Sequence, residues 1–366
     1  MTKRLVLLGG GHAHVHVLRT LGVLPLADVT VTLISPYARQ VYSGMLPGWV
    51  AGHYTIDQCV IPLPPLCRAS GVEFKQTHAT GIDFIRNIVR CADGQEIAFD
   101  TLSIDTGPVA NLALIPGAIE HAISIRPIET FIDAYEIIAA TILANPNKRR
   151  VRIAFVGAGA GGVELAMAMQ HAFRDLDLGV TLISAANTLP GNVGPRLAAR
   201  MQQHGIAILA NQAAAEILPT GVRLASGGIV EADYVFASIG AAAATWPRES
   251  GLVCDQQGYI LLNDRLQSVS HANVFAAGDC ASMEHHPRPK SGVYAVHAGP
   301  PLAENLRLAH AGQPLKRYVP QSRSLYLISA GEKYAIGSWG KFSWEGGWVW
   351  GWKDRIDRGF IGRYSL

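Results

Sequence analysis

The hydrophobic positions of this chain recur in the same order twice. A four-residue apolar stretch at 5–8 runs into the glycine-rich turn 9–11, and another at 153–156 runs into the turn 157–162. Apolar residues at helical spacing follow each turn, and about 20 residues later comes a second apolar stretch. These second stretches are 29–35 and 180–184. Each copy therefore predicts a strand–turn–helix–strand unit with parallel strands.

Glycine-rich turns of this kind bind dinucleotides for a physical reason. The first glycine allows a tight bend, the second lets backbone N–H groups approach a pyrophosphate, and the helix N-terminus favours negative charge. One such turn is a weak signal, but two turns placed alike between strand and helix predict two nucleotide sites. The residues expected at these sites are Gly9, Gly10, Gly11, His12, Ala13 and His14 in the first copy and Gly157, Gly159, Gly161 and Gly162 in the second.

Both copies depart from the usual pattern. The third glycine, which sets the packing of helix against strand, is Gly162 in the second copy but His14 in the first. We therefore expect the first helix to lie slightly farther from its strand. Each second strand ends in a serine, Ser35 before Pro36 and Ser184, where an acidic residue usually holds a ribose 2′-hydroxyl. Serine can bond that hydroxyl and does not repel a 2′-phosphate, so the choice between NAD and NADP stays open.

Three further apolar stretches also run into glycine. Two of them, 102–107 and 235–240, are paired between the copies, and each is expected as the last strand of its nucleotide domain. The third is 273–279, which ends in a carboxylate. A carboxylate at the carboxyl end of a sheet strand is where a ligand hydroxyl is expected. The candidate residues at these three strand ends are Thr106 and Gly107, Gly240, and Gly278 and Asp279.

Composition narrows the class of protein. The chain has 366 residues, of which 49% are hydrophobic and 16% charged, which fits two or three compact domains. A net charge of +3 without a long basic run gives no case for a nucleic-acid partner. Five scattered cysteines without CxxC spacing argue against a disulfide framework or zinc site and favour the cytoplasm. No apolar stretch reaches the roughly 20 residues of a spanning helix, so any membrane contact is expected to be peripheral.

Together these motifs resemble the two-dinucleotide-binding-domain flavoproteins, the pyridine nucleotide-disulfide oxidoreductase superfamily. It includes glutathione reductase, type II NADH dehydrogenase and sulfide:quinone reductase. The resemblance implies that the first turn binds FAD, the second binds NAD(P)H, and Gly278 and Asp279 hold the ribityl and phosphate end of the flavin. It also implies an α/β fold with two Rossmann-like domains, the second inserted in the first. The expected segments are 1–125 and 251–312 for the FAD domain, 126–250 for the NAD(P)H domain, and 313–366 for a small C-terminal segment.

A narrower resemblance rests on the segments 42–48 and 290–296, with the turn Gly-Gly-Gly-His-Ala-His. They are similar to the NADH-dehydrogenase-like FAD subunits found alone or fused to selenophosphate synthetase. Met45 in the first segment and Lys290 and Ser291 in the second are therefore expected at the FAD site. The selenium connection is a family association and says nothing about the substrate of this chain.

The cysteine positions bear on the chemistry. A disulfide reductase of this superfamily carries a CxxxxC pair after the second FAD strand, but the segment 41–50 contains no cysteine. Cys59 and Cys67 come later, in a proline-rich segment, and are read as buried thiols with no redox role. Their absence from the flavin segment also weakens a sulfide-oxidising function. Direct hydride transfer from NAD(P)H to FAD remains.

Two residues are candidates for a catalytic role. Glu164, placed in the first turn of the second helix, either contacts the nicotinamide side or is a carboxylate favoured at a positive helix end. Lys290 precedes a helix that we expect to begin with Ser291 as its cap. In the superfamily this helix points at the flavin pyrimidine, where Lys290 could stabilise reduced flavin; the alternative is an exposed lysine without a role. A metal at His12, His14 and His16 is not favoured, because no carboxylate or cysteine completes a site.

The C-terminal segment is rich in tryptophan and basic residues. Five tryptophans lie within 339–352, and four basic residues follow within 353–363. This combination favours a membrane interface. The alternative is that the indoles cover the FAD domain or form a homodimer contact.

These observations predict an FAD-dependent NAD(P)H dehydrogenase that reduces a quinone. We expect it in the cytoplasm, peripheral on the inner face of the cytoplasmic membrane. One alternative within enzymes is a sulfide:quinone reductase-like protein or a soluble reductase with a protein or selenium-linked partner. A non-enzymatic alternative is a flavin-binding regulatory module, which would suit His14 and the two strand-end serines.

Overall fold

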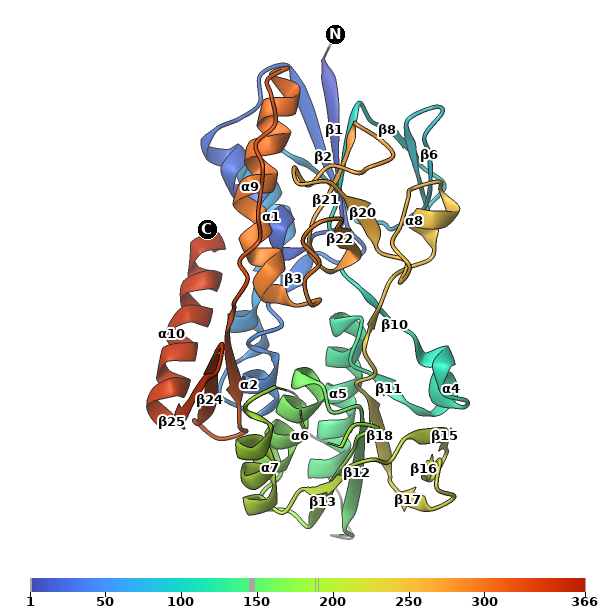
Figure 1. Cartoon of the computed structure of the whole chain (residues 1–366), viewed down its shortest axis with the longest axis vertical. Coiled ribbons are helices and arrows are strands. Elements are labelled where there is room, and N and C mark those ends of the chain that lie inside the picture. The colour runs from blue at the N-terminus through green and yellow to red at the C-terminus, as the bar shows by residue number, and fades with distance from the viewer. Residues whose placement is uncertain (1, 145–148, 188, 190, 366) are drawn as a thin grey trace.

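The computed structural model describes residues 2–144, 149–187, 189 and 191–365. Two α/β domains lie one above the other along the long axis of the molecule, and the C-terminal segment runs beside both (Figure 1). The chain builds most of the upper domain, crosses to the lower one, returns, and ends at α10. The second domain is therefore inserted in the first.

A parallel sheet forms the centre of the upper domain. Its strand order is β21-β9-β1-β2-β5. The last four residues of β1 are all buried, because a parallel strand covered on both faces must be apolar along its length. The helices α1 and α9 pack against each other beside it, close enough that a Cβ on Gly299 would lie 2.8 Å from His16. The bounds are β1 Lys3–Leu8, β2 Val29–Ile34, β5 Glu73–Lys75, β9 Thr101–Ile104, β21 Val274–Ala276, α1 His12–Val23 and α9 Gly292–His310.

The lower domain repeats this plan. Its parallel sheet has the order β11-β18-β12-β13-β14. The sequence predicted β9 and β18 as the last strands of their sheets. In the structure neither is at the edge, because β21 lies beyond β9 and β11 lies beyond β18. The short strand β11 comes two residues before the boundary expected at 126, yet it pairs with β18 of the lower sheet. The bounds are β11 Ile123–Ser124, β12 Val151–Val156, β13 Leu178–Ile183, β14 Ala207–Leu209, β18 Tyr234–Ala237, α5 Ile128–Leu143, α6 Ala160–Ala172 and α7 Gly194–Gln203.

Each domain also carries a small antiparallel sheet, and the two sheets share an irregularity. The first is formed by β6 Ala79–Asp83, β7 Ile88–Cys91 and β8 Glu96–Ala98, and the second by β15 Ala214–Leu218, β16 Gly221–Leu224 and β17 Ile229–Glu231. In both, the pairing register shifts by one residue near the start of the first strand, after Ala79 and after Ala214. The internal repeat thus extends beyond the glycine turns.

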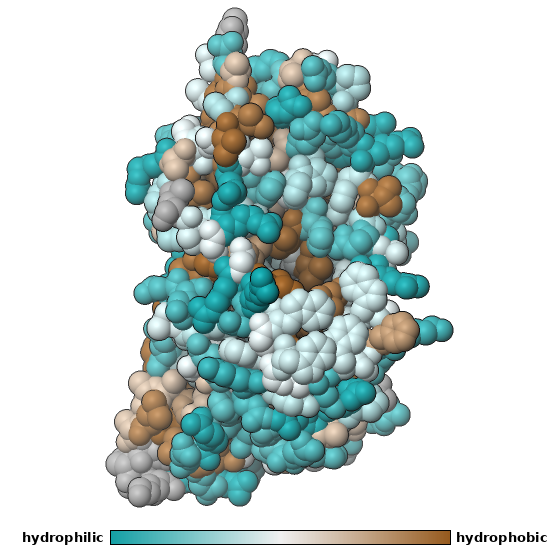
Figure 2. Space-filling model, turned by 90° about the vertical axis from the view of Figure 1, so that its left-hand side faces the viewer, coloured by the Kyte–Doolittle hydropathy of each residue, from teal (hydrophilic) through white to brown (hydrophobic). Residues whose placement is uncertain are grey.

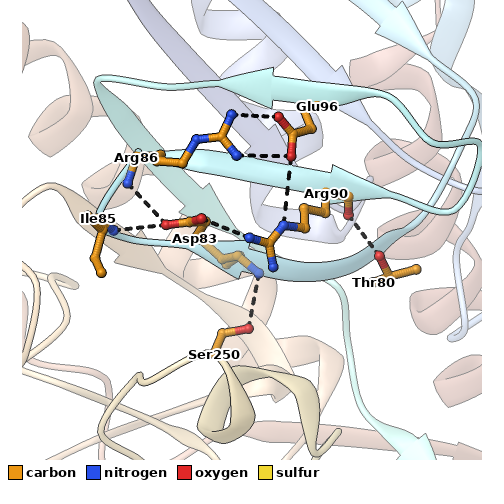
Figure 3. Close-up of polar contacts among 8 residues, drawn as sticks. Thr80, Asp83, Ile85, Arg86, Arg90, Glu96 and Ser250 are labelled. Carbon is orange, nitrogen blue, oxygen red and sulfur yellow. Dashed lines mark hydrogen bonds and ion pairs between the residues drawn. The ribbon is translucent and has the colours of Figure 1, made fainter.

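Ion pairs link the strands of the first small sheet at its surface. Arg86 bonds Glu96, and Arg90 bonds Asp83 at 2.8 Å (Figure 3). The hydroxyl of Ser250 accepts a hydrogen bond from the backbone of β6. That contact ties the sheet to the end of α8 Trp246–Glu249, where the chain has returned from the lower domain.

The two crossings between the domains pair with each other. On the way down the chain forms β10 Val109–Ala110, and on the way back it forms β19 Ala241–Ala242, which is antiparallel to β10. The returning chain then adds β20 Ile260–Leu262 and β22 Ala281–Met283 to the upper domain. The shorter elements of the first half are β3 Arg39–Val41, α2 Leu46–Val50, β4 Val60–Pro62, α3 Leu63–Ala69 and α4 Ala118–His121.

The C-terminal segment folds as a sheet followed by a helix. The strands β23 Leu325–Ser329, β24 Ala335–Trp339 and β25 Phe342–Gly346 are antiparallel, and α10 is Gly347–Tyr364. On α10, Phe360 stacks on Tyr42 of the upper domain with ring centres 4.4 Å apart. The turn after β23 meets α6 of the lower domain, where a Cβ on Gly331 would lie 2.4 Å from the Met167 carbonyl. Within the described part of the chain, no helix has the length and apolar character needed to cross a bilayer.

Candidate active site

The first glycine turn is shaped to leave no room for side chains on its inner face. Gly9 has φ +93°, and a Cβ there would lie 2.4 Å from the carbonyl oxygen of Asp105. A Cβ on Gly11 would lie 2.3 Å from the carboxyl carbon of the same aspartate. Only glycine fits at both positions. The turn is followed directly by α1, which begins at His12.

The second turn has the same geometry but one open side. Gly157 has φ +105°, and a Cβ on Gly162 would lie 2.3 Å from the Gly157 carbonyl. Gly159 precedes α6 and faces open space, with no protein atom within 4 Å of a Cβ built on it. This is the position where the backbone must approach a pyrophosphate. Gly161 lies beside Ile125, at 3.6 Å from the position of a Cβ.

His14 stands at the position that Gly162 occupies in the second copy. Its ring is fully buried, with Nδ1 2.6 Å from the Gly9 carbonyl and Nε2 2.8 Å from the Ser103 hydroxyl. Burial lowers the pKa of His14 to about 4. The imidazole is therefore a neutral bridge between the turn, α1 and β9.

The other two histidines of this helix have different partners. Burial also lowers the pKa of His12 to about 4, and its ring packs edge-on against Tyr42. His16 pairs with the Tyr364 hydroxyl at 3.2 Å. Across the described residues, no group of three or more histidine, cysteine or acidic side chains is arranged to hold a metal.

The strand-end serines have identical local geometry. The hydroxyl of Ser35 accepts the N–H of Tyr37 and donates to its carbonyl, at 3.3 and 3.0 Å. Ser184 does the same with Ala186, at 3.2 and 3.1 Å. Each hydroxyl thus already donates its proton to the backbone. Pro36 lies inside the first of these loops.

The remaining strand-end candidates line the same edges of the two sheets. Gly107, after Thr106, has φ +74°, and Gly107 and Gly240 both face open space where a Cβ would be. They follow β9 and β18, whose carboxyl ends lie beside those of β1 and β12. Met45 is fully buried in the core of the upper domain.

Asp279 and the start of α9 form one unit. Ser291 is the residue before α9, as expected, but its side chain makes no capping hydrogen bond. Its backbone N–H bonds Asp279 instead. Burial raises the pKa of Asp279, and the neighbouring cations Arg126 and Lys290 oppose that shift.

Lys290 is partly buried, unlike a solvent-exposed lysine without a role. Its ammonium group donates to the Ala281 carbonyl and lies 4.0 Å from the centre of the Tyr259 ring. Burial lowers the pKa of Lys290. Together with Gly278 and Asp279 it lines a pocket beneath α9. The glycine turns, the Gly-Asp pair and the start of α9 therefore fit a dinucleotide such as FAD.

Glu164 has a different environment from the one expected. Because α6 begins at Ala160, Glu164 lies beyond the first turn, and a favourable interaction with the helix end does not account for it. It accepts the Ser329 N–H at 2.8 Å, and burial raises its pKa to about 7. Lys353 and Asp357 are the charged groups that act on it.

Lys353 and Asp357 complete a buried charged cluster that sequence reasoning missed. Lys353 is 7% exposed and Asp357 4%, and Lys353 donates to Asp357 and to the Gly44 carbonyl, both at 2.5 Å. The Tyr42 hydroxyl also bonds Asp357. The cluster joins α6, the segment around Gly44, β23 and α10. The spacing of Lys353 and Asp357 by four residues was the available signal, but in a basic, tryptophan-rich segment it resembled an exposed helix face.

The sequence pattern of the pyridine nucleotide-disulphide oxidoreductases matches residues 3–299. The chain belongs to this family. It is thus an FAD-dependent oxidoreductase that uses NAD(P)H.

Relatives and solved structures extend the match over nearly the whole chain. It is 28% identical to the NADH dehydrogenase-like protein YutJ of Bacillus subtilis, covering 92% of each chain. It is 26% identical to the demethylphylloquinone reductase NdbB of Synechocystis, over 76% of this chain and 72% of that protein. The sulfide:quinone oxidoreductase of Aquifex aeolicus has the same fold, with a TM-score of 0.82 at 20% identity over 99% of this chain and 91% of that one.

The family name refers to a redox disulfide, and the CxxxxC pair that forms it is missing from segment 41–50 of this chain. All five cysteines are free thiols. Cys59 and Cys67 are fully buried, and burial raises the pKa of each thiol to about 12. A thiol with so high a pKa carries almost no thiolate near neutral pH, which is unfavourable for a nucleophile.

Proposed function

We propose that this enzyme is an NAD(P)H:quinone oxidoreductase in which Glu164 supplies a proton to the quinone. Bound FAD would take hydride from NAD(P)H and pass two electrons to the acceptor. Balance then demands one more proton, because NAD(P)H + H⁺ + quinone gives NAD(P)⁺ + quinol. The observation that carries the proposal is the cluster of Glu164, Lys353 and Asp357 between the two domains.

The chemistry of the cluster suits this task. A carboxyl with a pKa raised to about 7 holds a proton for part of the time near neutral pH and can release it. Lys353 stabilises the carboxylate that remains, because its charge lowers the pKa of Glu164. Asp357 and the Gly44 carbonyl hold the ammonium group in place. The acidic and basic groups are thus arranged for proton transfer at low solvent exposure.

The relatives support a quinone as the acceptor. One of them is named as a demethylphylloquinone reductase, and another, from Haemophilus influenzae, as a type II NADH:quinone oxidoreductase. A sulfide-oxidising reaction is less well supported, because four of the five cysteines are buried and Cys254 stands alone as a partly exposed thiol.

Glu164→Gln tests the proton-donating role. We expect quinone turnover to fall by about 100-fold, the usual scale of a lost general acid. Ferricyanide, which accepts electrons without protons, should be reduced by the variant at the wild-type rate. Both rates are measured with the same NAD(P)H-reduced enzyme. Slower bleaching of the flavin by NAD(P)H in the variant would instead assign Glu164 to the nicotinamide and contradict the proposal.

We also propose that the exposed apolar side chains of the C-terminal segment contact a membrane surface. Phe342 is 74% exposed and Trp348 62%, and Trp339, Trp352 and Ile356 are each at least 38% exposed. Figure 2 shows the side of the molecule that carries α10, where the brown surface at mid-height is recessed and is surrounded by pale and teal residues. Exposed indoles beside basic residues favour the headgroup region of a bilayer.

A further inference from the structure

A buried acid occupies the end of the helix that the first glycine turn presents to FAD. Asp105 follows β9 and is 3% exposed. One of its carboxyl oxygens, Oδ2, accepts the N–H groups of Ala13 at 2.8 Å and His14 at 3.0 Å. These are amides of the first turn of α1, where a pyrophosphate is normally favoured.

The two glycine segments of the FAD site are built around this carboxyl group. A Cβ on Gly11 would lie 2.4 Å from both carboxyl oxygens, and a Cβ on Gly278 would lie 2.5 Å from Oδ1. The group is therefore enclosed between the pyrophosphate turn and the Gly-Asp turn. Any negative charge that FAD brings to either segment comes close to Asp105.

The charges around the site oppose an ionised Asp105. Asp279 is its acidic neighbour, and the cations Arg126 and Lys290 act on Asp279. A bound pyrophosphate adds further negative charge. Burial, with the charge of Asp279, raises the pKa of Asp105 to about 7, although the amides of His14 and Ala13 oppose the shift.

Most groups that face this carboxyl do not change charge near neutral pH. Burial lowers the pKa values of His12 and His14 to about 4. Burial, with the charge of Asp105, raises the pKa of the Cys280 thiol to about 12. Lys290 is the competing group, because burial lowers its pKa, and the experiment must separate it from Asp105.

We propose that Asp105 is a positioning residue of the FAD site that must be protonated when FAD is bound. Above neutral pH, binding of FAD then takes up one proton from solution, and the affinity for FAD falls as the pH rises. A neutral carboxyl group can still accept the two amide hydrogen bonds and can donate one of its own, without repelling the pyrophosphate. The inference rests on FAD binding and is independent of the acceptor.

The test is equilibrium release of FAD from the full-length holoprotein between pH 6 and pH 9. A dilution series at each pH, followed by the fluorescence of free FAD, gives the dissociation constant. For the wild type we expect the dissociation constant for FAD to change little with pH near pH 6 and to rise by about tenfold per pH unit on the alkaline side. A wild-type profile without this rise would overturn the proposal, whatever the variants do.

Two variants assign the titrating group. Asp105→Asn keeps an acceptor for the two amides and carries no charge. Its dissociation constant for FAD should therefore not change with pH, and at pH 9 it should be lower than that of the wild type. The matched control is Asp175→Asn, at an acid whose side chain is 88% exposed in the lower domain, and it should keep the wild-type profile. A rise that persists in Asp105→Asn would point to Lys290 and refute the role of Asp105.

Discussion

At the scale of single residues, the glycine positions could be predicted and their neighbours could not. The two turns were found from residue type and spacing alone, because few sequences other than dinucleotide sites need glycine at those points. That Asp105 packs under Gly11, or that His14 bonds Ser103, depends on strands far away in the chain. A local pattern cannot supply such contacts.

Serine at the strand ends shows the same limit. The sequence left Ser184 available to a ribose hydroxyl, but its proton is already given to the Ala186 carbonyl. Near it, the side chains of Asn187 and Asn211 bond each other at 3.0 Å. Both side chains are neutral. They provide neither a negative charge that would repel the 2′-phosphate of NADP nor a positive charge that would bind it.

Two glycines of the second turn give a sharp prediction, because they are needed for different reasons. A methyl group at Gly162 would clash with the Gly157 carbonyl, so Gly162→Ala should lower the free energy of unfolding by about 1–3 kcal/mol. Gly159 faces open space and has φ −64°, so Gly159→Ala should leave stability unchanged. It should nevertheless weaken NAD(P)H binding by about tenfold or more, because the backbone can no longer approach the pyrophosphate.

Thermal unfolding and NAD(P)H titration of both variants check this prediction. Equal loss of stability in the two variants would contradict the geometry of the turn. Unchanged NAD(P)H affinity in Gly159→Ala would mean that the pyrophosphate lies elsewhere.

At the scale of elements, the buried parallel strands were the easiest to predict. The last four residues of β1 and of β12 are all apolar and buried, as expected for parallel strands that are covered on both faces. The short strands β10, β11 and β19 left no such signal, since they have two residues each and are defined by their partners. The orientation of the C-terminal helix was not predicted. In the structure Lys353 and Asp357 of α10 are buried, whereas Trp348 is exposed.

The outward face of the C-terminal segment gives a prediction about membranes. Replacing Phe342 and Trp348 together by serine should weaken binding to anionic lipid vesicles by about tenfold or more, because both side chains would lose apolar burial in the bilayer. The control is Ile85→Ser, at a side chain that is 97% exposed on the turn between β6 and β7. Cosedimentation measures the binding, and sedimentation velocity measures the oligomeric state. A dimer that the double variant dissociates, with no vesicle binding by the wild type, would contradict the membrane proposal.

At the scale of the whole molecule, the two nucleotide-binding domains have the same sheet topology and lie one above the other. The C-terminal segment holds the copies together from the side, since α10 packs on the upper domain and the turn after β23 packs on α6. The cluster of Glu164, Lys353 and Asp357 exists only where these three parts meet. The repeat in the sequence predicted the two nucleotide-binding units, and the family resemblance implied that the second is inserted in the first, but this junction required the folded chain.

Electron transfer from NAD(P)H through the flavin to a quinone is tested most directly by an anaerobic experiment on the purified wild-type enzyme. NAD(P)H is added first, and a water-soluble quinone second, while flavin absorbance is recorded. We expect the flavin to bleach with NAD(P)H and to recover fully as one quinone per flavin becomes quinol. Flavin that stays oxidised in excess NADH and NADPH, or reduced flavin that no quinone reoxidises, would contradict this expectation.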